Sequence, residues 1–237
     1  MWYAKTYGGY ARDSTEAHSN ANEIALALYG NNWCKESVCA LLGNGAGESG
    51  LNPWRWESND IPTVAQFEAW TDQEARLHGY GIFQFTPAKK YINSTNQSIY
   101  ANAGYAPNFA DSAGNANDGR AQTLFFMNSV SSDWLHELYN YYYDDFIGIG
   151  VDITPWYYTT FDNFKNGVDN NGNPLTLDEL VGVFELSYER PGDTYAASSY
   201  SARCDSASYW YSQINPPSPG YNFSKMPWIY YLKRRRY

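Results

Sequence analysis

A glycine-rich stretch that ends in a glutamate carries the residue types needed for proton transfer. The glutamate is Glu48, and Gly43, Gly45 and Gly47 precede it in a segment whose apolar residues recur at helical spacing. Glu48 lies seven residues after Leu41, so a continuous helix places both on the same buried side. Burial disfavours the charged form of a lone carboxylate and raises its pKa. The spacing therefore predicts a general acid at the end of a helix.

The glycines before Glu48 are unfavourable for the helix that carries it. A glycine in a helix interior costs up to about 1 kcal/mol relative to alanine. Close approach of another backbone, or of a ligand, would account for three of them in one turn. The alternative is an exposed glutamate at a helix end, which is the commoner setting for this residue type.

A second run, residues 79–87, reads Gly-Tyr-Gly-Ile-Phe-Gln-Phe-Thr-Pro. Its two glycines indicate a tight turn or hairpin, and Gln84 is its one strongly hydrogen-bonding side chain. An amide both donates and accepts hydrogen bonds, which suits a sugar hydroxyl or an N-acetyl group. The alternative is an ordinary strand with Gln84 on its solvent-facing side, since isolated short motifs are weak evidence.

Together the two runs resemble the phage tail lysozyme family. The shared pieces are Glu-Ser followed by Asn-Pro in residues 48–53, the Gly-Tyr-Gly-x-x-Gln-x-Thr-Pro run, and Tyr-Glu-Arg-Pro at residues 188–191. The resemblance covers residues 20–213, and the family is related to goose-type lysozymes and soluble lytic transglycosylases. It implies a mainly helical, α+β lysozyme-like fold with a small β-hairpin region beside the active-site cleft.

The resemblance also implies an activity: a muramidase that hydrolyses the β-1,4 bond between N-acetylmuramic acid and N-acetylglucosamine in peptidoglycan. It would belong to a phage tail in the virion and act outside the host cell on its wall, with other tail proteins as partners. Glu48 would protonate the glycosidic oxygen, and no cofactor is implied. The expected substrate contacts are Tyr80, Gln84, Trp56 and Tyr188. Two alternatives stay open, a lytic transglycosylase acting on the same bond and a non-catalytic wall-binding or structural tail protein.

A second carboxylate is expected in the tryptophan-rich and acidic region after Glu48. An inverting glycosidase spaces its carboxyl groups by about 6.5–9.5 Å and a retaining one by about 5–5.5 Å. Asp60 is the first candidate to orient the attacking water, with Glu57 and Asp72 behind it. The alternative for each is a solvated loop charge.

The composition excludes several classes of partner. A net charge of −9 is unfavourable for binding nucleic acid, and no apolar run is long enough to span a membrane.

Three cysteines are too few for a disulfide framework, and the scattered histidines show no zinc spacing, so no metal is expected. The aromatic content of 18% suits both a core and a cleft that stacks sugars. The N-terminus lacks the aliphatic character of a signal peptide, which fits delivery by a phage particle.

The chain divides into a lead-in over residues 1–18, a lysozyme-like domain over 19–213 and a proline-marked tail or linker over 214–237. Helices are predicted over 20–29 with Asn20 as N-cap, over 35–48, from Asp118 onwards, and over 195–213. The pair Thr176 and Glu179 forms a capping-box pattern before a further helix. The apolar face of that helix ends at Tyr188.

Overall fold

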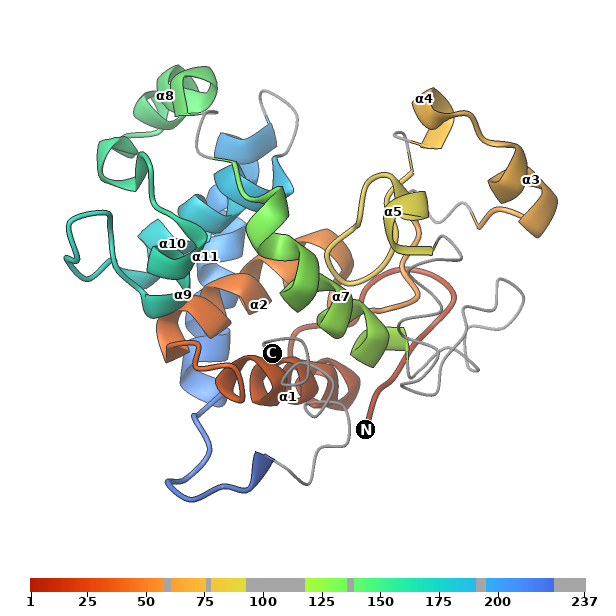
Figure 1. Cartoon of the computed structure of the whole chain (residues 1–237), viewed down its shortest axis with the longest axis horizontal. Coiled ribbons are helices and arrows are strands. Elements are labelled where there is room, and N and C mark those ends of the chain that lie inside the picture. Colours follow the sequence, from red (N-terminus) through yellow and green to blue (C-terminus); the bar gives the residue numbers. More distant parts are fainter. Residues whose placement is uncertain (58–60, 76–77, 93–117, 136–138, 191–194, 224–237) are drawn as a thin grey trace, which may run out of the picture.

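A computed structural model describes residues 1–57, 61–75, 78–92, 118–135, 139–190 and 195–223, and these are mainly helical (Figure 1). None of their helices is both long and apolar enough to cross a membrane. The elements in chain order are α1 (Thr15–Tyr29), α2 (Lys35–Ser49), α3 (Val64–Ala69), α4 (Asp72–Ala75), α5 (Ala88–Ile92), α7 (Asp118–Asp133), α8 (Tyr139–Gly148), the 3-10 turn η3 (Thr154–Trp156), α9 (Phe161–Asn166), α10 (Leu177–Phe184), the π-helical turn η4 (Glu185–Glu189) and α11 (Tyr195–Gln213).

The central element is α2, the helix predicted over residues 35–48. Helices α10 and α11 pack along it, and α1 and α9 contact it as well (Figure 1). All of its residues from Ser37 to Gly45 are buried, as expected for a helix surrounded by protein. The helix stops at Gly50, which adopts the left-handed conformation with φ of 59°. The end of α2 is therefore fixed from several sides, and Glu48 is its last residue but one.

Two of the glycines of α2, Gly43 and Gly47, face the closely packed helix α11. A Cβ atom at position 43 would lie 2.7 Å from the carbonyl oxygen of Arg203 and 2.7 Å from the Cβ of Ala207. A Cβ at position 47 would lie 3.3 Å from the Cγ of Arg203. The prediction that a neighbouring backbone accounts for these glycines is confirmed at Gly43. The absence of a side chain at these two positions allows α11 to pack closely against the end of α2.

Replacing Gly43 by Ala is expected to lower the free energy of unfolding by about 1–3 kcal/mol, because the added methyl group overlaps the backbone of α11. Urea denaturation measures the change. Gly148→Ala is the matched control, since a Cβ there meets no atom within 4 Å. The control should leave stability unchanged or raise it by about 0.4–1 kcal/mol. A Gly43→Ala protein as stable as the control would contradict the close packing of α11 on α2.

The predicted start of the first helix, with Asn20 as its N-cap, was wrong. Helix α1 begins at Thr15 and is capped by Ser14, not by Asn20. The Asn20 side chain is instead buried, accepting a hydrogen bond from the backbone N–H of Tyr3 (2.8 Å) and donating to the carbonyl oxygens of Tyr3 and Leu51 (both 2.9 Å). The buried amide of Asn20 thus connects α1 to the N-terminal segment at Tyr3 and to the residue after the end of α2, Leu51. The N-terminal segment therefore packs against the helices.

The expected β-hairpin is not found in the described residues. Tyr80 forms isolated antiparallel bridges with Trp56 and with Phe85, and no longer strand extends from them. The run from Gly79 to Phe85 is thus a compact turn tied to the segment after α2. Elsewhere the predicted elements are present: α7 begins at Asp118, α11 spans residues 195–213, and α10 has the predicted capping box.

Candidate active site

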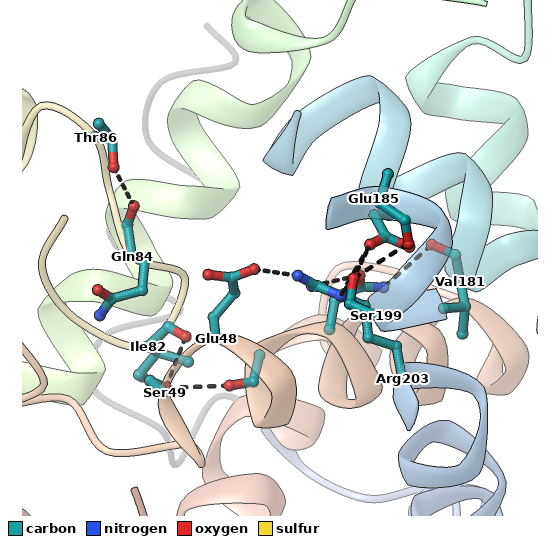
Figure 2. A network of polar contacts seen from close by, with 12 residues as sticks. Glu48, Ser49, Ile82, Gln84, Thr86, Val181, Glu185, Ser199 and Arg203 are labelled. Atoms are coloured by element: carbon teal, nitrogen blue, oxygen red, sulfur yellow. Dashed lines mark hydrogen bonds and ion pairs between the residues drawn. The ribbon is translucent and has the colours of Figure 1, made fainter. Parts of the chain in front are cut away.

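Glu48 lies at the end of α2 with its side chain 19% exposed, and its Oε1 accepts a hydrogen bond from Nη2 of Arg203 (Figure 2). Arg203 comes from α11, on the opposite side of Glu48 from the turn that carries Gln84. The prediction of a lone carboxylate is therefore wrong. The carboxylate of Glu48 is paired with a guanidinium and still reaches the surface.

Arg203 connects several buried polar groups to Glu48. Its side chain is only 2% exposed. Nη1 donates to Oδ1 of Asn44 at 3.0 Å, and Nε donates to Oγ of Ser199 at 3.2 Å and lies 3.0 Å from Oε1 of Glu185. Because all three guanidinium nitrogens have partners, Arg203 is held in one orientation. It thereby fixes the position of Glu48 relative to α11.

Glu185 is the buried acidic partner of Arg203. Its side chain is fully enclosed, and Oγ of Ser199 donates to its Oε1 at 2.6 Å, whereas its Oε2 has no hydrogen-bond partner. Burial raises the pKa of Glu185 to about 7, although Arg203 and Ser199 act in the opposite direction. Near neutral pH this carboxyl group therefore exists in both protonation states.

Gln84 uses its amide within its own turn. Nε2 donates to the carbonyl oxygens of Arg55 (3.0 Å) and Gly81 (2.9 Å). In Figure 2 the amide points away from the carboxylate of Glu48. The backbone of Gln84 has φ of 42°, an unusual value outside glycine that is often found at functional sites. Both amide hydrogens thus stabilise the turn, and the side chain reaches a ligand only through its oxygen.

Two further side chains connect the Gln84 turn to α2 and α7 through hydrogen bonds. Ser49, the residue after Glu48, donates from Oγ to the carbonyl oxygens of Ile82 (2.8 Å) and Gly45 (3.1 Å) (Figure 2). Gln122 of α7 accepts from the N–H of Ile82 at 2.7 Å and donates to the carbonyl oxygen of Pro53 at 2.6 Å. The Glu-Ser pair therefore joins the candidate acid to the turn.

Tyr80 and Trp56 were expected to contact substrate, and the structure corrects this. Tyr80 is 0% exposed and Trp56 is 1% exposed, so neither presents a surface to a sugar. The hydroxyl of Tyr80 donates to Asp118, which also accepts from the hydroxyl of Tyr91 and, at 2.9 Å, from Gln122. These aromatic residues form the interior that supports the turn. Burial raises the pKa of Asp118 to about 6.

Tyr188 lines a pocket of about 70 Å³ between the turn and η4. It packs on Phe126 and Phe184 and is almost fully buried, so only an edge of it faces the pocket. The pocket lies where a ligand would meet both the turn and η4. Its lining residues are Phe83, Gln84, Phe85, Thr86, Lys90, Tyr188, Glu189 and Arg190.

The predicted second carboxylate, Asp60, lies outside the described residues. Its first alternative, Glu57, accepts a hydrogen bond from the N–H of Gly79 at 2.7 Å and so supports the turn. Asp72 begins α4. Arg203 and Glu185 were not among the site residues predicted from the sequence. Arg203 is the single basic residue of α11, and an isolated cation in a helix of small residues is a signal that could have indicated a buried partner.

Stability should fall as the pH rises through the neutral range. Glu185 has a pKa of about 7 in place of the ordinary 4.5, and Asp118 about 6 in place of 3.8. At a pH between the ordinary pKa and the raised pKa of each group, the folded protein binds more protons than the unfolded chain. Rising pH therefore favours unfolding. We expect the melting temperature to be highest near pH 4.5 and to decrease toward pH 7.

Calorimetry across this range measures the effect. Glu185→Gln, which keeps the neutral shape, should flatten the profile between pH 5 and 7 relative to the wild-type protein. A melting temperature that instead rises steadily over this interval would contradict the assigned burial of the two carboxyl groups.

The sequence matches the model of the phage tail lysozyme family over residues 19–214. The chain belongs to this family. It is also similar to Morphogenesis protein 1 of Bacillus phage B103, with 34% identity over 74 residues. That alignment covers 31% of this chain but only 17% of the phage B103 protein. Within the residues that the structure describes, the cluster around Glu48 combines a partly exposed carboxylate with a buried guanidinium and a second carboxyl group.

Proposed function

We propose that this chain is a muramidase that hydrolyses the β-1,4 bond between N-acetylmuramic acid and N-acetylglucosamine in peptidoglycan. One observation carries the proposal: the carboxylate of Glu48 is partly exposed at the rigid end of α2, between the Gln84 turn and Arg203 (Figure 2). Family membership supports the substrate class. Glu48 is the essential carboxylate of the proposed site.

The surroundings of Glu48 suit the cleavage of a glycosidic bond. This reaction needs a proton on the leaving oxygen and removal of a proton from the attacking water. Glu48 supplies a partly exposed carboxylate, and Glu185, which is joined to it through Arg203, has its pKa raised to about 7 by burial. The pocket lined by Gln84 and Arg190 offers polar groups beside the edge of Tyr188, a combination that suits a sugar hydroxyl or N-acetyl group.

The biological setting that we propose is a phage tail. The enzyme would act from the virion, outside the host cell, to open the wall during infection, and its partners would include other tail proteins. Support comes from the family and from the phage B103 relative, which is itself named a morphogenesis protein.

The test is incubation of the purified chain with purified Gram-positive peptidoglycan, followed by measurement of turbidity and analysis of the soluble fragments. We expect clearing and new reducing N-acetylmuramic acid ends. Fragments with 1,6-anhydro ends would replace the hydrolase by a lytic transglycosylase. Tight binding to the wall without release of fragments would replace it by a non-catalytic wall-binding protein.

A further inference from the structure

The contact between Arg203 and Glu48 sets a condition on the proposed reaction. A general acid must hold a proton before it can give one to the glycosidic oxygen. A guanidinium in contact with a carboxyl group favours the charged form of that group. Nη2 of Arg203 binds Oε1 of Glu48, so Arg203 by itself would keep Glu48 ionised. Glu48 can act as the acid only if a second negative charge compensates Arg203.

Glu185 is in the position to supply that charge (Figure 2). Its Oε1 lies 3.0 Å from Nε of Arg203 and accepts a hydrogen bond from Oγ of Ser199 at 2.6 Å. Nη1 of the same guanidinium donates to the amide oxygen of Asn44 at 3.0 Å, and Nη2 binds Glu48. Because Arg203 and Glu185 are both buried, water screens their attraction only weakly. One buried cation is thus shared by two carboxyl groups, of which one is enclosed and the other partly exposed.

The other ionisable groups near Glu185 do not replace it in this role. In the described parts of the chain they are Tyr142 of α8, Cys204 of α11, and Glu189 and Arg190 of its own segment. Burial raises the pKa of the first three, that of Cys204 to about 12, which favours their neutral forms. An arginine stays charged at every pH of interest. The charge of Arg203 is therefore divided between Glu48 and Glu185.

A single proton on this cluster has two places to go. With both carboxyl groups ionised, Glu48, Glu185 and Arg203 together carry one negative charge, and one proton makes them neutral. When Glu185 holds that proton, Arg203 pairs with Glu48, which then has no proton to give. When Glu185 is charged, its ion pair with Arg203 is kept and the proton is on Glu48. A substrate that covers the exposed edge of Glu48 favours the second arrangement, because loss of water disfavours the charged form.

We propose that Glu185 is a positioning residue of the reaction: its carboxylate takes over the charge of Arg203, so that Glu48 can carry the proton that it gives to the glycosidic oxygen. The inference rests on the proposed function. Glu185 acts only through Arg203, since its own side chain is fully enclosed. Its Oε2 has no hydrogen-bond partner, so its charged form depends on Arg203 and on the hydrogen bond from Ser199 to Oε1.

Replacing Glu185 by Gln tests this role, because the amide keeps the shape of the side chain and removes its charge. Arg203 then compensates Glu48 alone, and Glu48 loses its proton at a lower pH. The alkaline limb of the pH–rate profile should therefore move down by about 1 pH unit, the lower range of the effect that an opposite charge has on a carboxyl group. The rate on the acidic side of the wild-type optimum should change much less. Release of soluble fragments from purified peptidoglycan gives the profile.

Two companion variants separate charge from packing. Glu185→Asp keeps the negative charge beside Arg203, so its profile should stay close to the wild-type position. Ser199→Ala removes the hydrogen bond that favours the charged form of Glu185, so its profile should move in the same direction as that of Glu185→Gln, by a smaller amount. Melting temperatures show whether each variant folds. A merely structural role would lower the rate at every pH and leave the position of the profile unchanged.

A second readout does not depend on activity. Nuclear magnetic resonance of the carbon-13-labelled side chain follows the uptake of a proton by Glu48 directly. The midpoint of this titration should lie at a lower pH in Glu185→Gln than in the wild-type protein and in Glu185→Asp. An unchanged midpoint, or equal shifts in the two Glu185 variants, would overturn the inference while the muramidase proposal stands. A wild-type chain that releases no fragments would reject the proposed function, and the titration would still decide whether Glu185 controls the charge of Glu48.

Discussion

Replacing Glu48 by Gln is expected to reduce the release of soluble fragments from peptidoglycan by at least about 100-fold, the usual lower range for loss of a proton-transferring group. Gln has the same shape, and its amide oxygen can still accept the hydrogen bond from Arg203. It cannot exchange a proton. The rate of fragment release measures the effect, and the melting temperature shows whether the fold is retained.

Glu68→Gln is the matched control for this variant. Glu68 is exposed on α3, which lies apart from α11 and the end of α2 in Figure 1, so its replacement should leave the rate of fragment release unchanged. Clearing by Glu48→Gln at the rate of this control would show that the carboxylate of Glu48 is not required.

The second large effect concerns stability. Arg203→Met should lower the free energy of unfolding by about 3–5 kcal/mol at neutral pH, because it leaves the buried Glu185 without its cation. The loss should be smaller at pH 4.5, where carboxyl groups take up protons. Urea denaturation at the two pH values measures both quantities.

A double variant separates charge from packing. In Arg203→Met combined with Glu185→Gln, the uncompensated charge is gone, so part of the lost stability should return relative to the single Arg203 variant. No recovery would mean that Arg203 stabilises the protein through its packing against Gly47 and not through the ion pair.

The local pattern of α2 could be predicted because it depends on neighbours in sequence. Apolar spacing gave the helix, and the glycines indicated the close approach that α11 makes at Gly43. The partner of Glu48 could not be predicted in this way. Arg203 lies 155 residues further along the chain, and nothing in the spacing around Glu48 specifies a guanidinium there.

Residue type alone also left the roles of the aromatic and amide side chains ambiguous. Tyrosine and tryptophan are equally suited to stacking on sugars and to packing in a core. The burial of Tyr80 and Trp56 in the structure assigns both to the core. The amide of Gln84 could donate to a sugar or to its own turn, and it donates to the turn. Likewise Ser14 and Asn20 are both good N-caps, and tertiary contacts take Asn20 into the interior.

The most direct test of the central claim is cleavage of peptidoglycan in water enriched in oxygen-18, with mass analysis of the released fragments. Hydrolysis at the proposed site should yield reducing N-acetylmuramic acid ends that carry one heavy oxygen, and Glu48→Gln should yield almost none. Fragments that end in 1,6-anhydro-muramic acid without the label, or an intact wall with the wild-type chain bound to it, would contradict hydrolysis by this cluster.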